Sequence, residues 1–214
     1  MDNVWLRPRR EPRQTLSLGR IVAEAVALLD EEGVARLTMR RLAERLDTGS
    51  TTLYWHVKTK DDVLDLALDA VFGEVPLPAA GGDWRERVRE VIGGWRAALL
   101  RHPWTATILD RPLMGPNALE HTEALYAALA AAGLEGPRLK AAAYSLANLV
   151  MGSVIMQVTA EGHGDAAAFL EERASRYPLL ARHGLDCDWD AAFADGLGFL
   201  LTGMRDGDGT GAPA

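Results

Sequence analysis

The apolar residues of this chain recur at helical spacing along most of its length. The clearest stripe runs from Ile21 to Leu29 with a period of about 3.6 residues. Ser17 precedes this stripe as a candidate N-cap and Gly33 follows it, so we expect a helix over 18–32. No segment shows the regular alternation of a half-buried strand. The pattern therefore predicts an all-α fold.

Further helices are expected from Thr38 to about Leu46, from Ser50 to His56, from Thr59 to about Leu77, and over about 83–101, 117–132, 138–160, 165–176 and 188–204. The run Asp47–Gly49 predicts a turn between the two shortest of these helices. Thr59 and Asp62 have the spacing of a capping box, as do Asp83 and Glu86. Glycines and prolines separate the remaining segments.

Two helices as short as those on either side of the turn cannot be stable alone in water, and must pack on a third element. The helix over 18–32 supplies that element, which gives a three-helix unit. We therefore expect a flexible basic arm over 1–16, a helix-turn-helix domain over 17–66, a helical effector-binding and dimerisation domain over 67–205, and a disordered tail over 206–214.

The net charge of −7 argues against nucleic acid as a partner, but its distribution does not. The first sixty residues carry more Lys and Arg than Asp and Glu, whereas the rest of the chain carries a large excess of acid. The single cysteine, Cys187, excludes an intramolecular disulfide, and no uninterrupted apolar run reaches the ~18 residues of a membrane span. We expect a cytoplasmic protein without a membrane partner.

Outward positions of the helix-turn-helix carry side chains that suit DNA. B-DNA admits one α-helix into its major groove, where small hydroxyls reach base edges and longer polar groups reach phosphates. The predicted DNA-binding residues are Thr38, Arg40, Ser50, Thr51, Thr52, Tyr54, His56 and Lys60. Leu53 and Val57 are expected to face inward. Packing of the Tyr54–His56 segment inside an arbitrary helical domain is the alternative.

The residue runs Leu37–Ala43 and Thr52–Lys60 carry a specific resemblance. They resemble the DNA-binding domain of the TetR family of transcriptional regulators, and the second run is especially similar to the tetracycline-repressor branch. The resemblance covers about 17–66 and implies that the eight residues above contact operator DNA. Asp47 departs from the family, which usually has a glycine at this turn; Asp tolerates left-handed backbone better than most residues. Arginines before Ser17 are either a minor-groove arm or a solvated tail.

The C-terminal region resembles the tetracycline-repressor type more weakly. The resemblance implies a small-molecule effector in each subunit and a homodimer formed by the last two long helices. Glycines and alanines in these helices suit close helix contact, although an internal core is the alternative. The predicted ligand-binding residues are Trp95, Trp104, Arg111, Met114, Tyr126, Tyr144, Asn148 and Met151, with His121 as a further candidate. Each of them could instead be an ordinary core residue.

The resemblance also bears on the effector. Family members that bind tetracycline hold magnesium through a histidine four residues before an Arg-Pro pair, and Thr107 occupies that position here, before Arg111-Pro112. We therefore expect another effector, and no metal or cofactor. Asp186, Asp188 and Asp190 lack the glycine and glutamate of a calcium loop, so they are interpreted as solvated acids at a helix N-terminus.

The sequence thus predicts a DNA-binding transcriptional regulator, in particular a repressor that a small effector releases from its operator. An activator or architectural protein with the same DNA-binding domain is the alternative. A helical-bundle enzyme is disfavoured because no nucleophile with a base and no pair of catalytic acids is evident. Operator reading by symmetric dimers places two recognition helices about 34–36 Å apart.

Overall fold

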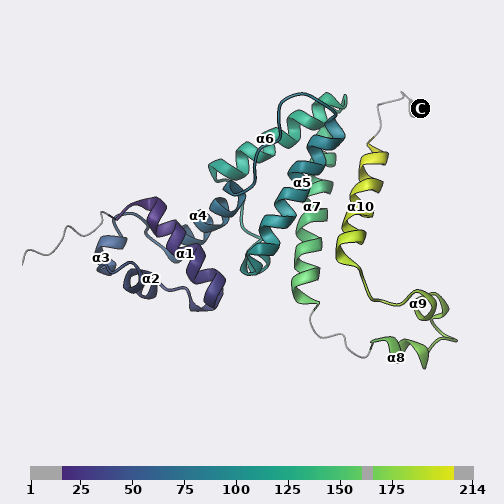
Figure 1. The fold of residues 1–214 in the computed structure, drawn as a ribbon, viewed down its shortest axis with the longest axis horizontal. Helices are drawn as coiled ribbons and strands as arrows, with labels where there is room; N and C mark the ends of the chain where they lie inside the picture. Colours follow the sequence, from purple (N-terminus) through teal and green to yellow (C-terminus); the bar gives the residue numbers. More distant parts are fainter. Residues whose placement is uncertain (1–15, 161–165, 205–214) are drawn as a thin grey trace, which may run out of the picture. The chain divides into compact units, whose positions relative to one another are not determined.

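The computed structural model describes residues 16–160 and 166–204, and these residues form helices without any strand. The chain divides into two compact units, with the boundary between Ala67 and Leu68. Figure 1 shows the course of the helices within each unit. The all-α fold expected from the sequence is confirmed for the described residues.

The first unit is built around one long and two short helices. Its elements are α1 (Leu18–Glu32), the 3-10 turn η2 (Val34–Arg36), α2 (Met39–Arg45), α3 (Ser50–Leu53) and the beginning of α4 (Lys60–Gly73). The Ser17 hydroxyl accepts a hydrogen bond from the Arg20 amide at 3.3 Å, and Gly33 ends α1 with a φ of 75°. Both ends of the first helix therefore lie where the sequence predicts.

The beginning of α4 is fixed by the predicted capping box. The Asp62 amide donates to the Thr59 hydroxyl at 3.0 Å, and the Asp62 carboxylate accepts from the Thr59 amide at 3.1 Å. The Thr59 hydroxyl and then the Lys58 amide, which also donate to this carboxylate, lower the pKa of Asp62. These reciprocal bonds satisfy amides that a helix start leaves without partners.

Two helices end earlier than the sequence predicts. The helix that begins at Ser50 ends at Leu53, and turns whose hydrogen bonds join residues three apart in the chain continue to His56. The helix expected to reach Leu77 ends at Gly73, because Pro76 disfavours helical backbone at the residue before it.

The second unit is a helical bundle that continues from the end of α4. Its elements are α5 (Trp84–Arg101), η3 (Pro103–Thr107), α6 (Pro116–Ala131), α7 (Gly136–Thr159), α8 (Ala166–Glu171), α9 (Pro178–His183) and α10 (Trp189–Gly203). Helix α5 packs on both α6 and α7, and α10 packs on α7 (Figure 1). The predicted helix over 165–176 is wrong in its length, and α9 was not predicted. Pro178 at the first turn of α9 starts this separate helix.

A close approach fixes the segment after α4 against α5. A Cβ atom built on Gly94 would lie 2.5 Å from Cγ1 of Val75, so a larger residue at position 94 displaces Val75. Val75 is buried, and so are Val91 and Ile92 on the preceding turn of α5. Glycine at position 94 is therefore a packing requirement of the bundle.

Arg96 is a charged side chain inside this bundle and connects three helices. Its guanidinium donates to Ser153 Oγ at 3.0 Å and Gln157 Oε1 at 2.6 Å, both on α7, and to Asp190 Oδ1 at 2.6 Å on α10. The same group lies 4.7 Å from the ring centroid of Phe193. These partners compensate the burial of the guanidinium.

Replacing Arg96 with Met is expected to loosen α10. The variant loses the bonds to α7 and α10, which costs about 2 kcal/mol in local stability. Amide hydrogen exchange in α10 should accelerate by about tenfold or more. The control Asp190→Asn is expected to change exchange by less than about threefold, because the Asp190 side chain is 83% exposed and exposed ion pairs contribute little. Equal acceleration in both variants would contradict this role of Arg96.

Candidate functional site

The turn between α2 and α3 has the geometry that a helix-turn-helix needs. Asp47 adopts a φ of 48°, and the Thr48 amide donates to the Ala43 carbonyl at 3.0 Å. Left-handed backbone at a non-glycine residue is tolerated best by residues such as Asp. Leu53 and Val57 are buried, as predicted, and hold α3 onto the unit.

Ion pairs fix α2 on α1. Arg45 pairs with both Glu24 and Glu31, and Arg41 pairs with Glu32. The hydrogen bonds that Arg45 donates, first to Glu31 and then to Glu24, raise the pKa of Arg45, and the bond from Arg45 lowers the pKa of Glu31. These two arginines therefore position the helices of the unit.

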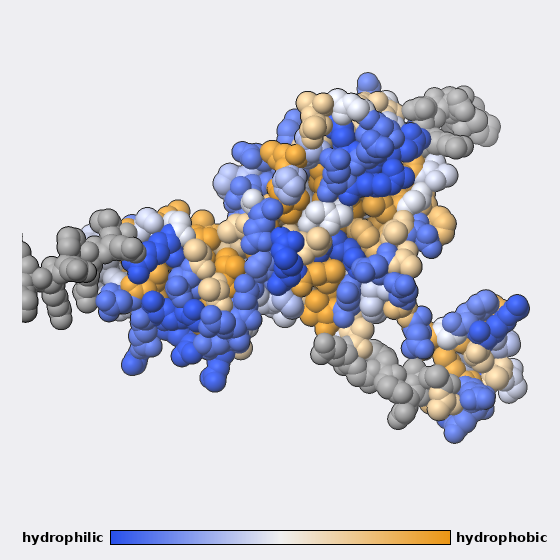
Figure 2. Space-filling view, in the orientation of Figure 1, coloured by the Kyte–Doolittle hydropathy of each residue, from blue (hydrophilic) through white to orange (hydrophobic). Residues whose placement is uncertain are grey.

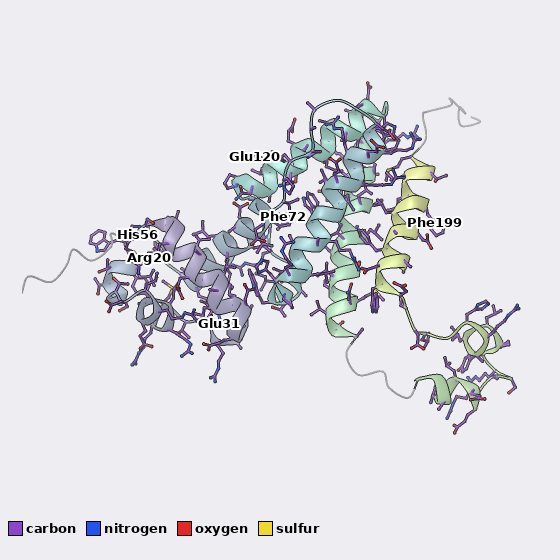
Figure 3. The ribbon with its side chains drawn as sticks, in the orientation of Figure 1. Arg20, Glu31, His56, Phe72, Glu120 and Phe199 are labelled. Atoms are coloured by element: carbon purple, nitrogen blue, oxygen red, sulfur yellow. The ribbon has the colours of Figure 1, made fainter. Side chains whose placement is uncertain are left out.

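Seven of the eight predicted DNA-binding side chains are exposed, namely Thr38, Arg40, Ser50, Thr51, Thr52, Tyr54 and His56. They come from the N-cap and first turn of α2, from α3 and from the turn that follows α3. Thr38 also caps α2 by accepting from the Arg41 amide at 3.1 Å, and Arg40 pairs with Glu44 at 2.9 Å. Figure 3 shows His56 projecting from the end of this region.

The eighth residue, Lys60, is half-buried. Its ammonium donates to the Val34 carbonyl at 2.7 Å, which ties the start of α4 to the turn after α1. An ammonium has three donors, so this bond leaves capacity for a phosphate. Contact with DNA stays a prediction for all eight residues.

Trp55 is a candidate that the sequence prediction missed. Its side chain is 86% exposed, whereas most large apolar residues of this unit are buried. It lies directly between Tyr54 and His56 in the same turn, so the turn presents three consecutive ring side chains. The sequence signal for Trp55 is its position between two residues that are predicted to face outward.

The eight predicted ligand-binding residues differ in burial. Trp95 and Trp104 are buried, Arg111, Tyr126 and Met151 are half-buried, and Met114, Tyr144 and Asn148 are exposed. Thr107, at the position of the magnesium-binding histidine of tetracycline-binding members, donates its hydroxyl hydrogen to the Trp104 carbonyl at 2.7 Å. Ligand contact remains a prediction for the whole set.

A cluster of rings lies where α4 ends and α5 and α6 meet it. The ring centroids of Phe72 and Trp95 are 5.5 Å apart at 87°, and those of Trp95 and His121 are 6.4 Å apart at 73°. Figure 3 places Phe72 between α4 and α5. All three side chains are buried, so the cluster is an internal connection between the three helices.

The end of α4 also holds the beginning of α6. The Asp69 carboxylate accepts from the Ala118 amide at 2.9 Å and from the Asn117 side-chain amide at 3.0 Å. A Cβ on Gly115 would lie 2.2 Å from Asp69 atoms, so the two segments are in close contact. Asp69 thus stabilises the N-terminus of α6 from another helix.

Helices α7 and α10 leave an apolar face without a partner within the described chain. Tyr144 is 68% exposed, Met156 59% and Phe199 76%. Only 28% of the most apolar window of α7 is buried. Figure 2 shows apolar surface among hydrophilic patches on this unit, and Figure 3 labels Phe199 on α10. By length and composition alone, α7 is also apolar enough to span a membrane.

Comparisons with known proteins follow the division into two units. Residues 21–67 match the family model described as bacterial regulatory proteins, tetR family, and residues 76–207 match that of the tetracyclin repressor-like C-terminal domain. The chain is 46% identical to an HTH-type transcriptional regulator of Saccharopolyspora erythraea over 94% of this chain and 90% of the relative. It is 36% identical to the HTH-type transcriptional repressor DrrR1 of Streptomyces coeruleorubidus over 94% and 80%.

Solved structures of transcriptional regulators are similar to this chain as well. The chain resembles apo ActR from Streptomyces coelicolor with a TM-score of 0.82 and 32% identity, over 92% of this chain and 100% of that one. ActR has also been solved with actinorhodin, and that structure matches with a TM-score of 0.80. The fold and both sequence regions lead to one conclusion: this chain belongs to the TetR family of bacterial transcriptional regulators and is not an enzyme.

Proposed function

We propose that this regulator is a homodimeric repressor in the cytoplasm, which binds operator DNA through α3 and releases it when a small effector binds the second unit. The observation that carries the proposal is the exposed row of hydroxyl and ring side chains on and around α3, supported from beneath by buried Leu53 and Val57. The relative named as a repressor, at 36% identity, supports repression over activation.

The dimer is supported by the apolar face of α7 and α10. An exposed face with Tyr144, Met156 and Phe199 is costly in water, and burial against an identical face removes that cost. Gly152 and Gly198 have open space where a Cβ would stand, so a second chain can approach closely there. This arrangement accounts for the apolar character of α7 without a membrane.

Helix α4 supplies a physical connection between the two functions. It is continuous from Lys60, which is bonded to the Val34 carbonyl, to Gly73, and Asp69 near its end holds the start of α6. An effector that displaces α6 or the ring cluster therefore acts on the same helix that begins in the DNA-binding unit. Release requires that the effector bind the operator-competent and released conformations unequally.

The effector is proposed to be an organic compound other than magnesium-bound tetracycline. Thr107 has no ring nitrogen for a metal, and its hydroxyl already bonds to Trp104. The ActR structure with actinorhodin supports a small organic ligand for a relative of this type.

The direct test is a gel shift at fixed salt with duplexes from the region upstream of the gene. Retention of one duplex below micromolar protein, with an unrelated duplex not retained, is the expected outcome. Failure of every upstream duplex would contradict the repressor proposal. A reporter gene measured with and without the regulator then separates repression from activation.

The DNA contacts are tested by substitution. Lys60→Ala is expected to weaken binding to all duplexes and to reduce the slope of log affinity against log salt by about one. Thr52→Ala is expected to alter preference among operator variants without changing that slope. Lys140→Ala, an exposed lysine on α7, is the control and should leave both properties unchanged. An unaltered salt slope in Lys60→Ala would assign that residue to structure alone.

The dimer is tested at Phe199. Phe199→Glu places a charge on the apolar face and is expected to convert the dimer to a monomer in analytical ultracentrifugation, with loss of operator retention. Leu119→Glu on α6, where Leu119 is 46% exposed, is the matched control and should remain dimeric. A dimeric Phe199→Glu protein would exclude this face as the interface.

A further inference from the structure

Two buried nitrogen atoms in the ring cluster have no hydrogen-bond partner within the described chain. They are Nε1 of Trp95, whose side chain is 4% exposed, and Nδ1 of His121, whose side chain is 3% exposed. Leaving a buried polar group unpaired costs about 1–3 kcal/mol, and native proteins rarely do so without a reason. Two such atoms on neighbouring rings indicate a place where another molecule supplies the missing bonds.

The hydrogen-bonding roles of the two atoms follow from their neighbours. His121 Nε2 lies 3.0 Å from the Val75 carbonyl oxygen, which can only accept, so Nε2 carries the hydrogen. In the neutral imidazole, Nδ1 is then an acceptor. The indole Nε1 of Trp95 is always a donor. The pair therefore presents one donor and one acceptor.

This combination restricts the chemistry of a ligand. An ether or ketone satisfies Trp95 and leaves His121 unpaired. An ammonium satisfies His121 and leaves Trp95 unpaired. A carboxylate would bury a negative charge beside two uncharged rings. A hydroxyl both donates and accepts, and it is the smallest group that suits the two nitrogens together.

The surroundings define the rest of the ligand. Phe72 lies edge-on to Trp95, and Trp95 and His121 are in edge-to-face contact with ring centroids 6.4 Å apart, so a ligand would bind beside these rings and not between them. Aromatic side chains favour an apolar, preferably aromatic, ligand body.

From this geometry we propose that Trp95 and His121 together bind the hydroxyl group of an aromatic effector. The inference rests on the proposed effector-binding function and names the chemistry of that site. Occupation of the pair acts on residues that adjoin the end of α4: Phe72 belongs to α4, and the Val75 carbonyl is bonded to His121. Binding there thus bears on the helix that continues into the DNA-binding unit.

The test uses 1-naphthol and 1-methoxynaphthalene as probes with the full-length protein. The two share their rings, but the methoxy oxygen cannot donate a hydrogen bond to His121. We expect 1-naphthol to bind about five- to tenfold more tightly by calorimetry, as one additional hydrogen bond implies. It should also shift the indole N–H resonance of Trp95, which is identified by its absence in Trp95→Phe.

Three variants locate the preference. Trp95→Phe keeps a ring and removes the donor, and His121→Gln keeps an amide donor for the Val75 carbonyl while removing the acceptor at Nδ1. His121→Gln should reduce the preference for 1-naphthol to less than about twofold. Trp95→Phe should weaken the binding of both probes and leave the preference, because both probe oxygens accept from the indole N–H. Trp84→Phe, the same change elsewhere on α5, should keep the affinity and the preference. Thermal unfolding verifies that each variant is folded. If His121→Gln does not fold, the shift of the Trp95 resonance in the unaltered protein still tests the proposal.

Several results would overturn the proposal. These are equal affinity for the two probes, no binding of either, a preference retained in His121→Gln, unchanged affinity of both probes in Trp95→Phe, or a crystal structure in which a water molecule bonds to both nitrogens while 1-naphthol is bound elsewhere. None of them changes operator retention measured without probe. Failure here therefore remains distinguishable from failure of the regulator proposal.

Discussion

The DNA-binding surface depends on one packing constraint, which is that α3 is too short to exist alone. Four helical residues form about one turn, and an isolated helix of that length is unstable in water. Burial of Leu53 and Val57 and the reversed backbone at Asp47 hold the turn in place. The ion pairs between Arg45 and the two glutamates of α1 fix the orientation of the preceding helix. The outward side chains are therefore positioned by contacts that face away from DNA.

Local signals in the sequence were sufficient for much of this architecture. The caps at Ser17 and at Thr59 with Asp62 act between neighbours in the chain, so their spacing alone placed the starts of α1 and α4. The apolar pattern alone does not predict the end of α4. Val75 continues the apolar stripe, but Pro76 disfavours helical backbone at Val75, and the helix ends at Gly73. Helix α9 is not evident from the apolar pattern either, because a proline such as Pro178 can end one helix or start the next.

The interior of the second unit could not be predicted in the same way. Arg96 resembles any surface arginine in sequence, and its partners lie 57, 61 and 94 positions away. Trp95 was selected as a ligand residue because it is aromatic, but the unpaired state of its nitrogen emerges only from the packing of three helices. Tyr144, predicted for its aromatic ring, and Asn148, predicted as a polar group that orients a ligand, lie exposed on the single chain. Residue type suggests chemistry, while long-range packing determines which polar atoms are satisfied.

Arg96 and the Trp95–His121 pair, the polar features of that interior, differ in how far their hydrogen-bonding groups are satisfied. Arg96 has three hydrogen-bonding partners and stabilises the bundle. Trp95, the preceding residue of α5, and His121 on α6 each have a buried nitrogen without a partner in the described chain. Structural and recognition roles are thus assigned to adjacent residues of α5.

The contact between Val75 and Gly94 has a consequence for the substitutions that such a regulator tolerates. A Cβ at position 94 would meet the side chain of Val75, the residue whose carbonyl is bonded to His121. We therefore expect a substitution at position 94 to disturb the proposed effector site through Val75. In a mutational library, this position should tolerate few replacements, because its role is in packing.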